Sequence, residues 1–288
     1  MRSALAVMVF GLVASLGCGK ATGTRGSSAA TRAEPLLAES GTESPSRTDP
    51  NGEDESRPVP CAQRATTKGE VVELPVPGFR PSVVSLPLPT ESLKDESLIL
   101  AAHGAGDSAR SQCEVWREIV GSCGAILCIS GTPIGPGDHN GFFFANHLEL
   151  EKEVLAAVQA LIAHFGERIA THDAVYAAYS QGATMGALML HAHGDLFSRL
   201  VLVEGGSWNW TLSRGKQFRD SGGKRILLVC GTTGCNTGAQ KSAQVLAKSG
   251  LSVRVLDVPG GGHAYWGAVA HAVAKDWPWV IEADDRWR

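Results

Sequence analysis

The chain has 288 residues, of which 43% are hydrophobic and 19% charged, and this composition excludes a chain that is disordered throughout. The formal net charge is −3, from 26 basic and 29 acidic residues, so the basic excess typical of nucleic-acid-binding proteins is missing and no nucleic-acid partner is expected. Composition changes along the chain and divides it into three segments, residues 1–18, 19–68 and 69–288.

The first segment, residues 1–18, has the pattern of an export signal. Arg2 precedes an uncharged, mostly apolar run over residues 4–16, which is too short to span a membrane but has the length of a secretory signal core. The run ends at Ser15-Leu16-Gly17-Cys18, which resembles a bacterial lipobox with Ser15 and Leu16 in the reverse of the usual order. The resemblance implies a signal peptide and lipidation of Cys18, which would anchor the protein to a membrane of the cell envelope, in the periplasm or at the outer membrane. Cleavage followed by secretion, or an uncleaved anchor, are the alternatives.

The second segment, residues 19–68, is predicted to be a disordered tether. It is rich in Ser, Thr, Gly, Glu and Pro and contains no aromatic residue before position 61. Such a stretch cannot bury enough apolar surface to offset the entropy lost on ordering.

The third segment, residues 69–288, alternates short apolar runs with helical patterns. Two β-runs at its start are divided by a Pro-Gly turn signal, and their prolines favour an edge position in a sheet. The later runs are apolar on both faces, which is typical of parallel strands covered by helices on both sides. The expected strands are 71–77, 82–89, 97–102, 125–130, 174–179, 200–204, 226–230 and 253–258. The expected helices are 109–120, 146–165, 181–193, 238–248 and 265–277. Together they predict an α/β protein with an eight-stranded, mostly parallel, doubly wound sheet.

A serine stands between the fifth expected strand and the following helix. Ala178-Tyr179-Ser180-Gln181-Gly182 places small residues two positions before and after Ser180. This resembles the nucleophile elbow of α/β-hydrolases, with Ala178 in place of the first glycine. The resemblance covers about residues 70–288 and implies that Ser180 is a nucleophile.

A nucleophilic serine requires a base, and a histidine follows the last expected strand. His263 comes after Gly260-Gly261-Gly262, so its ring can reach over the edge of the sheet. The sequence therefore predicts that His263 deprotonates Ser180.

The third expected strand ends in His103-Gly104-Ala105-Gly106. This resembles the His-Gly loop that supplies part of the oxyanion hole in α/β-hydrolases. The resemblance implies that the backbone amides of Gln181 and of Ala105 or Gly104 bind the oxyanion, and that His103 orients the loop.

The acid of the predicted triad has three candidates. The loop after strand seven, where the family usually has an aspartate, contains no carboxylate. Glu204 ends strand six, a position that some superfamily members use for the acid, and it is the preferred candidate. Asn236 as a neutral partner and Asp257 in the last strand are the alternatives.

The cysteines fit an exported protein. Apart from Cys18 there are six, an even number that favours disulfides in an oxidising compartment: Cys61, Cys113, Cys123, Cys128, Cys230 and Cys235. The two that are five residues apart, Cys230 and Cys235, form the most plausible local pair. No pattern of zinc-ligand spacing is present in the sequence, and neither a metal nor a cofactor is expected.

Aromatic residues follow two of the predicted site residues. Trp208 and Trp210 come after Glu204, and Tyr265 and Trp266 come after His263. They predict an apolar substrate pocket, although ordinary packing explains them equally well.

These patterns predict an exported or lipid-anchored serine hydrolase, specifically a carboxylesterase acting on small esters through a Ser180-His263-acid triad. The missing acid after strand seven leaves open a non-catalytic envelope binding protein with the same fold. A serine peptidase or a thioesterase is a third interpretation.

Overall fold

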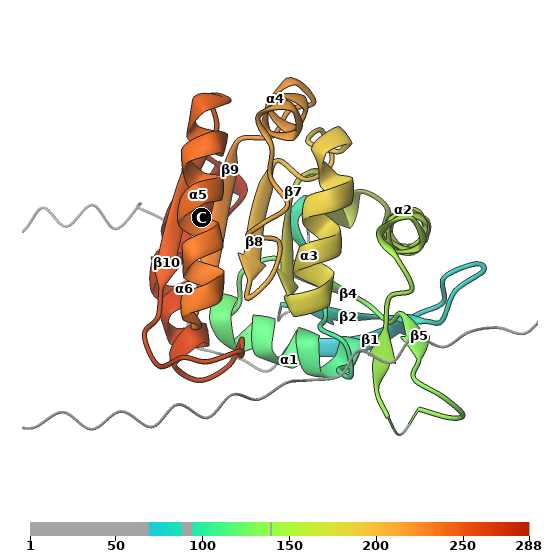
Figure 1. Ribbon diagram of the computed structural model, residues 1–288. Helices are drawn as coiled ribbons and strands as arrows, with labels where there is room; N and C mark the ends of the chain where they lie inside the picture. The colour runs from blue at the N-terminus through green and yellow to red at the C-terminus, as the bar shows by residue number, and fades with distance from the viewer. Residues whose placement is uncertain (1–68, 88–93, 139, 288) are drawn as a thin grey trace, which may run out of the picture. The chain divides into compact units, whose positions relative to one another are not determined.

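The computed structural model describes residues 69–87, 94–138 and 140–287 (Figure 1). The predicted signal peptide, Cys18, the tether and Cys61 therefore lie outside the described residues. Within the described part of the chain, none of the helices combines the length and apolar character that crossing a membrane requires.

An eight-stranded sheet forms the centre of this unit, in the order β1-β2-β4-β3-β7-β8-β9-β10. β1 pairs antiparallel with β2 and β2 with β4, whereas the other neighbours are parallel. The predicted doubly wound sheet is thus confirmed. The strands are β1 (Glu70–Leu74), β2 (Ser82–Leu86), β3 (Glu96–Ala102), β4 (Ala125–Ile129), β7 (Ile169–Tyr179), β8 (Arg199–Val203), β9 (Arg225–Cys230) and β10 (Ser252–Asp257), and a separate two-stranded pair is formed by β5 (Thr132–Pro133) and β6 (Phe142–Phe143).

Helices cover both faces of the sheet (Figure 1). Alternate residues of each central strand point to opposite faces, so Tyr176 of β7 packs with α2, α3 and α5 whereas Val175 and Ala177 pack with α1 and α6. Two cores therefore lie back to back across the sheet. The helices are α1 (Ala109–Val120), α2 (His147–Phe165), α3 (Ser180–Met189), α4 (Leu212–Asp220), α5 (Thr233–Lys248) and α6 (Ala268–Val280).

Local signals explain where the helices begin. Ser108, Asn146 and Thr232 have extended backbones and accept hydrogen bonds from amides in the first turns of α1, α2 and α5, as N-cap residues do. Because Thr232 caps α5, this helix starts at Thr233, five residues before its predicted start.

Two further expectations differ from the structure. β2 is not an edge strand, because it pairs with both β1 and β4; Pro81 and Pro87 lie outside it and so do not interrupt its hydrogen bonds. The segment between β8 and β9 contains the unpredicted helix α4, whose sequence is mainly polar and which buries only Gly215 and Phe218.

Two disulfides are described in full. Cys113–Cys128 joins α1 to β4, and Cys230–Cys235 joins the end of β9 to the first turn of α5. The predicted local pair is therefore confirmed.

Candidate active site

Ser180 lies at a sharp turn between β7 and α3. Its φ of 49° falls in the left-handed region, which is unfavourable for a residue with a side chain. The turn requires close backbone approach, since a Cβ atom on Gly182 would lie 2.5 Å from the carbonyl oxygen of Ala102. This strained strand-to-helix geometry resembles that of a nucleophile elbow, in which the serine hydroxyl is lifted out of the sheet.

His263 lies on the loop after β10 and reaches Ser180 across the end of the sheet. Its Nε2 is 2.8 Å from the Ser180 Oγ. The His263 side chain is 54% exposed, so the serine–histidine pair is open to solvent on the side of the ring.

Glu204 follows β8 and contacts the other ring nitrogen of His263. Its Oε2 lies 2.9 Å from His263 Nδ1, and its side chain is only 2% exposed. The buried carboxylate also accepts hydrogen bonds from the amides of Gly231 and Thr232 and from the Thr232 hydroxyl. Glu204 also has a φ in the left-handed region, 50°. At this second strained turn its side chain points toward the loop after the neighbouring strand β9.

The other two candidates for the acid have different surroundings. Asn236 lies in the first turn of α5, where its Oδ1 accepts from Gln240 Nε2 at 3.4 Å. Asp257 is the exposed last residue of β10, in register with Cys230. The structure thus brings Ser180, His263 and Glu204 together in a continuous hydrogen-bonded chain.

The loop after β3 lies beside Ser180. His103 is fully buried, and its ring nitrogens are 2.8 Å and 3.0 Å from the carbonyl oxygens of Gly104 and Ser130, contacts that tie this loop to the end of β4. The amide of Gly106 donates to Phe142 and that of Gly182 to His103. Of the two predicted donors in this loop, Gly104 is buried and Ala105 is exposed. Ala105 and Gln181, the residue after Ser180, are therefore the candidate oxyanion donors.

A pair of stacked tyrosines connects the histidine loop to the loop after β3. The Tyr179 and Tyr265 rings are 4.5 Å apart. Tyr179 donates to the backbone oxygen of His263 at 2.7 Å, and Tyr265 donates to Asp107 Oδ2 at 2.6 Å. Burial, together with the Asp107 carboxylate, raises the pKa of Tyr265, which keeps it a neutral donor. Neither Asp107 nor Tyr179 was predicted from the sequence to be a site residue, although Tyr179 directly precedes Ser180.

The four predicted pocket aromatics each lie in a different environment. Tyr265 is buried in the network just described, and Trp210 packs in the core against Phe218, so neither lines an open pocket. Trp208 is exposed, lying against Gly238 of α5 under Lys241. Trp266 is exposed beside the site, with its ring 6.3 Å from that of Tyr179.

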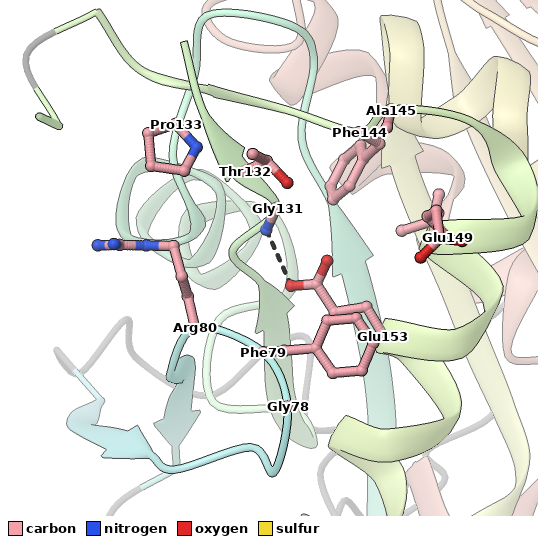
Figure 2. Close-up of a pocket in the computed structure, with 11 residues that line it drawn as sticks. Gly78, Phe79, Arg80, Gly131, Thr132, Pro133, Phe144, Ala145, Glu149 and Glu153 are labelled. Atoms are coloured by element: carbon pink, nitrogen blue, oxygen red, sulfur yellow. Dashed lines mark hydrogen bonds between the residues drawn. The ribbon is translucent and has the colours of Figure 1, made fainter. Parts of the chain in front are cut away.

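A cavity of about 460 Å³ lies between α2, the segment after β4 and residues 78–80 (Figure 2). Phe144 forms one wall, and its backbone N–H and C=O pair with the side-chain amide of Gln181. Figure 2 shows Glu153 of α2 reaching the backbone of Gly131, whose amide donates to Glu153 Oε1 at 2.9 Å. Glu153 therefore restrains one end of the segment 131–144, and Phe144 at the other end binds the Gln181 side chain.

Glu153 gives a pH-dependent contribution to stability. Burial raises the pKa of its carboxyl above the ordinary value, against the opposing effect of the Gly131 and Ser130 amides. The folded state thus binds the proton more tightly than the unfolded state, so this group makes folding less favourable as pH rises through its titration range. Glu153→Gln removes the titration.

We therefore expect the Tm difference between Glu153→Gln and the unmodified protein to grow more positive between about pH 4 and pH 8, measured by thermal melts. Glu149→Gln, at an exposed residue paired with Lys152, serves as the control. Melting curves of Glu153→Gln that track those of the unmodified protein at every pH would contradict the expectation.

The strand order, the serine elbow and the histidine after the last strand together define an α/β-hydrolase fold. No protein-family model and no curated protein matches the sequence, but solved structures do. The chain is similar to an S-formylglutathione hydrolase from Staphylococcus aureus, at 12% identity and a TM-score of 0.54, over 76% of this chain and 98% of that one. It is also similar to a thermostable esterase from Pseudomonas putida, at 16% identity and a TM-score of 0.53, over 74% and 82% of the two chains.

A third similar structure is the fluorophosphonate-binding serine hydrolase F of Staphylococcus aureus, at 12% identity and a TM-score of 0.54, over 75% of this chain and 100% of that one. At these identities the likeness concerns the fold.

Proposed function

We propose that the protein is a serine hydrolase that cleaves small carboxylic esters. The observation that carries the proposal is the continuous chain from Glu204 through His263 to Ser180, with separations of 2.9 Å and 2.8 Å. Both distances are within hydrogen-bond reach, which proton transfer between nucleophile and base requires.

In the acylation step, Ser180 Oγ attacks the ester carbonyl carbon while His263 Nε2 takes the hydroxyl proton. The carbonyl oxygen becomes negatively charged, and the amides of Gln181 and Ala105 stabilise it. Collapse of this intermediate breaks the bond to the alcohol, which receives the proton from His263. The acyl group is then bound to Ser180.

In the deacylation step, a water molecule gives a proton to His263 and attacks the acyl carbon. The exposure of His263 gives water direct access. The bond to Ser180 breaks, the proton returns to Ser180 Oγ, and the acid is released. Glu204 accepts from His263 Nδ1 throughout, which fixes the ring and stabilises its charged form.

A fluorophosphonate probe tests the proposal. The activated hydroxyl should attack phosphorus and displace fluoride, while its proton goes to His263. The single phosphonyl group added to the protein is detected by intact-mass analysis and placed on Ser180 by peptide mapping. Ser180→Ala should take up no label. Absence of label from the folded, unmodified protein would contradict the proposal and favour a non-catalytic binding protein.

The fluorophosphonate experiment tests neither the preference for esters nor the location of the protein. Fluorophosphonates also label peptidases and thioesterases, so turnover of p-nitrophenyl acetate, a thioester and a peptide must be compared. Export and lipid anchoring through Cys18 are supported by the sequence pattern alone.

A further inference from the structure

We infer that the Cys230–Cys235 disulfide positions the acid of the proposed triad, because it restrains the short loop 230–235 whose hydrogen bonds hold Glu204. The inference rests on the proposed function. The disulfide itself takes no part in the proposed bond-breaking steps, so its effect on catalysis would act through Glu204.

The residues enclosed by the disulfide supply the hydrogen bonds to Glu204. Gly231 and Thr232 follow Cys230 directly, and their amides donate to Glu204 Oε1 while the Thr232 hydroxyl donates to Oε2 at 2.9 Å. On the other side of the loop, the amide of Cys235 donates to Thr232 Oγ1 at 3.4 Å. The two sulfurs and a Glu204 carboxylate oxygen all lie within 4.8 Å of one another.

The same loop also holds the chain that carries His263. The carbonyl oxygen of Cys230 accepts from Val258, and that of Gly231 accepts from Gly262, the residue before His263. Residues 230–232 therefore bind the acid with their N–H groups and the histidine loop with their carbonyl oxygens. A shift of this loop would change the separation of Glu204 from His263.

Glu204 and its hydrogen-bond donors come from different strands, which explains why a covalent restraint on the donor loop would matter. Glu204 comes from β8, but its donors come from the loop after the neighbouring strand, β9. Its orientation therefore depends on how the segment after β8 and the loop after β9 lie relative to each other. The disulfide restricts the motion of the donor loop, so the carboxylate remains aligned with His263 Nδ1.

The second disulfide provides a matched control. Cys113 and Cys128 are both buried, whereas Cys230 is buried and Cys235 only partly so. Cys113–Cys128 joins α1 to β4 and closes a loop of sequence separation 15, compared with 5 for Cys230–Cys235. Because a longer loop gives a larger loss of unfolded-state entropy, removing Cys113–Cys128 should lower Tm more. By contrast, kcat should fall more when Cys230–Cys235 is removed than when Cys113–Cys128 is removed.

The experiment compares Cys230→Ala/Cys235→Ala with Cys113→Ala/Cys128→Ala, below the Tm of both, using p-nitrophenyl acetate. The first variant should lose about 10- to 100-fold in kcat, the range expected when a catalytic group is misplaced. KM should change little, because the buried Glu204 acts through His263. The control variant should retain kcat. It should also retain the far-downfield NMR signal of the proton between His263 and Glu204, which the first variant should lose.

A double-mutant cycle makes the test specific for Glu204. In a Glu204→Gln background, removing Cys230–Cys235 should cause no further loss of kcat, because the two changes act through one contact. The inference would be overturned if removing Cys230–Cys235 lowered kcat by the same factor in the unmodified protein and in Glu204→Gln. It would also be overturned if removing either disulfide lowered kcat equally. Unaltered kcat in the first variant would also overturn it while leaving the proposed function intact, whereas an unmodified protein without any turnover would contradict the proposed function itself.

A second pair of variants covers the case in which the cysteine variant does not fold. Thr232→Val removes the hydroxyl that binds Glu204 but keeps the disulfide, and Thr232→Ser keeps both. Reduced kcat in the first and normal kcat in the second would support the loop as the holder of Glu204. Normal kcat in both would overturn that role.

Discussion

Replacing Ser180 by alanine is expected to lower kcat for p-nitrophenyl acetate by about 10⁴-fold or more, without loss of the folded structure. The substitution removes the oxygen that lies 2.8 Å from His263 Nε2, so no acyl-enzyme can form. The fold should tolerate the change, because alanine retains the Cβ atom and the half-buried hydroxyl donates to no core acceptor.

Two further variants, His263→Ala and the double variant with Ser180→Ala, show whether Ser180 and His263 act in the same catalytic step. His263→Ala should cost about as much as Ser180→Ala, and the double variant should cost no more than either alone, since each removes the same step. Ser213→Ala, at an exposed serine of α4, should behave like the unmodified protein. Turnover in Ser180→Ala within tenfold of the unmodified value would move the nucleophile elsewhere.

The fold was predictable because each strand carries its own signal. β3, β4, β8 and β9 are continuous apolar runs that are buried along almost their entire length, and such runs are typical of strands covered on both faces. Helix α4 was not predictable in this way. Its sequence buries only two residues, so no apolar stripe marks its helical period.

The candidate site was predictable where it depends on position along the chain. Ser180 and His263 each follow a strand directly, and the carboxyl ends of parallel strands meet at one edge of the sheet. The alternatives for the acid could not be separated by the same argument, because Glu204, Asn236 and Asp257 all lie near strand ends. What distinguishes Glu204 is a strained turn and three donors from the neighbouring loop.

The supporting contacts were the least predictable part. Tyr265 and Asp107 are 158 residues apart in the sequence, and the pairing of Gln181 with the backbone of Phe144 spans 37 residues. No local pattern marks such a pair, since each depends on how loops from different strands meet. Trp210 was misjudged for the same reason, because its position after Glu204 does not show that the chain turns into the core.

Replacing Glu204 by glutamine is expected to lower kcat by about 10³- to 10⁴-fold while KM changes little. The amide oxygen of glutamine can still accept from the amides of Gly231 and Thr232. Its NH₂ group must then face His263 Nδ1, and two donors cannot share a hydrogen bond. The ring is therefore held in the tautomer that carries its proton on Nε2, where it cannot accept the proton of Ser180.

The competing assignments of the acid give opposite results in the same assay. If Glu204 is the acid, Asn236→Ala and Asp257→Asn should both retain kcat, because Asn236 contacts Gln240 and Asp257 is exposed at the end of β10. A large loss in either variant, combined with a mild effect of Glu204→Gln, would transfer the role of the acid. Glu204 would then be a structural carboxylate that caps the loop after β9, and the disulfide beside it would stabilise that loop without controlling catalysis.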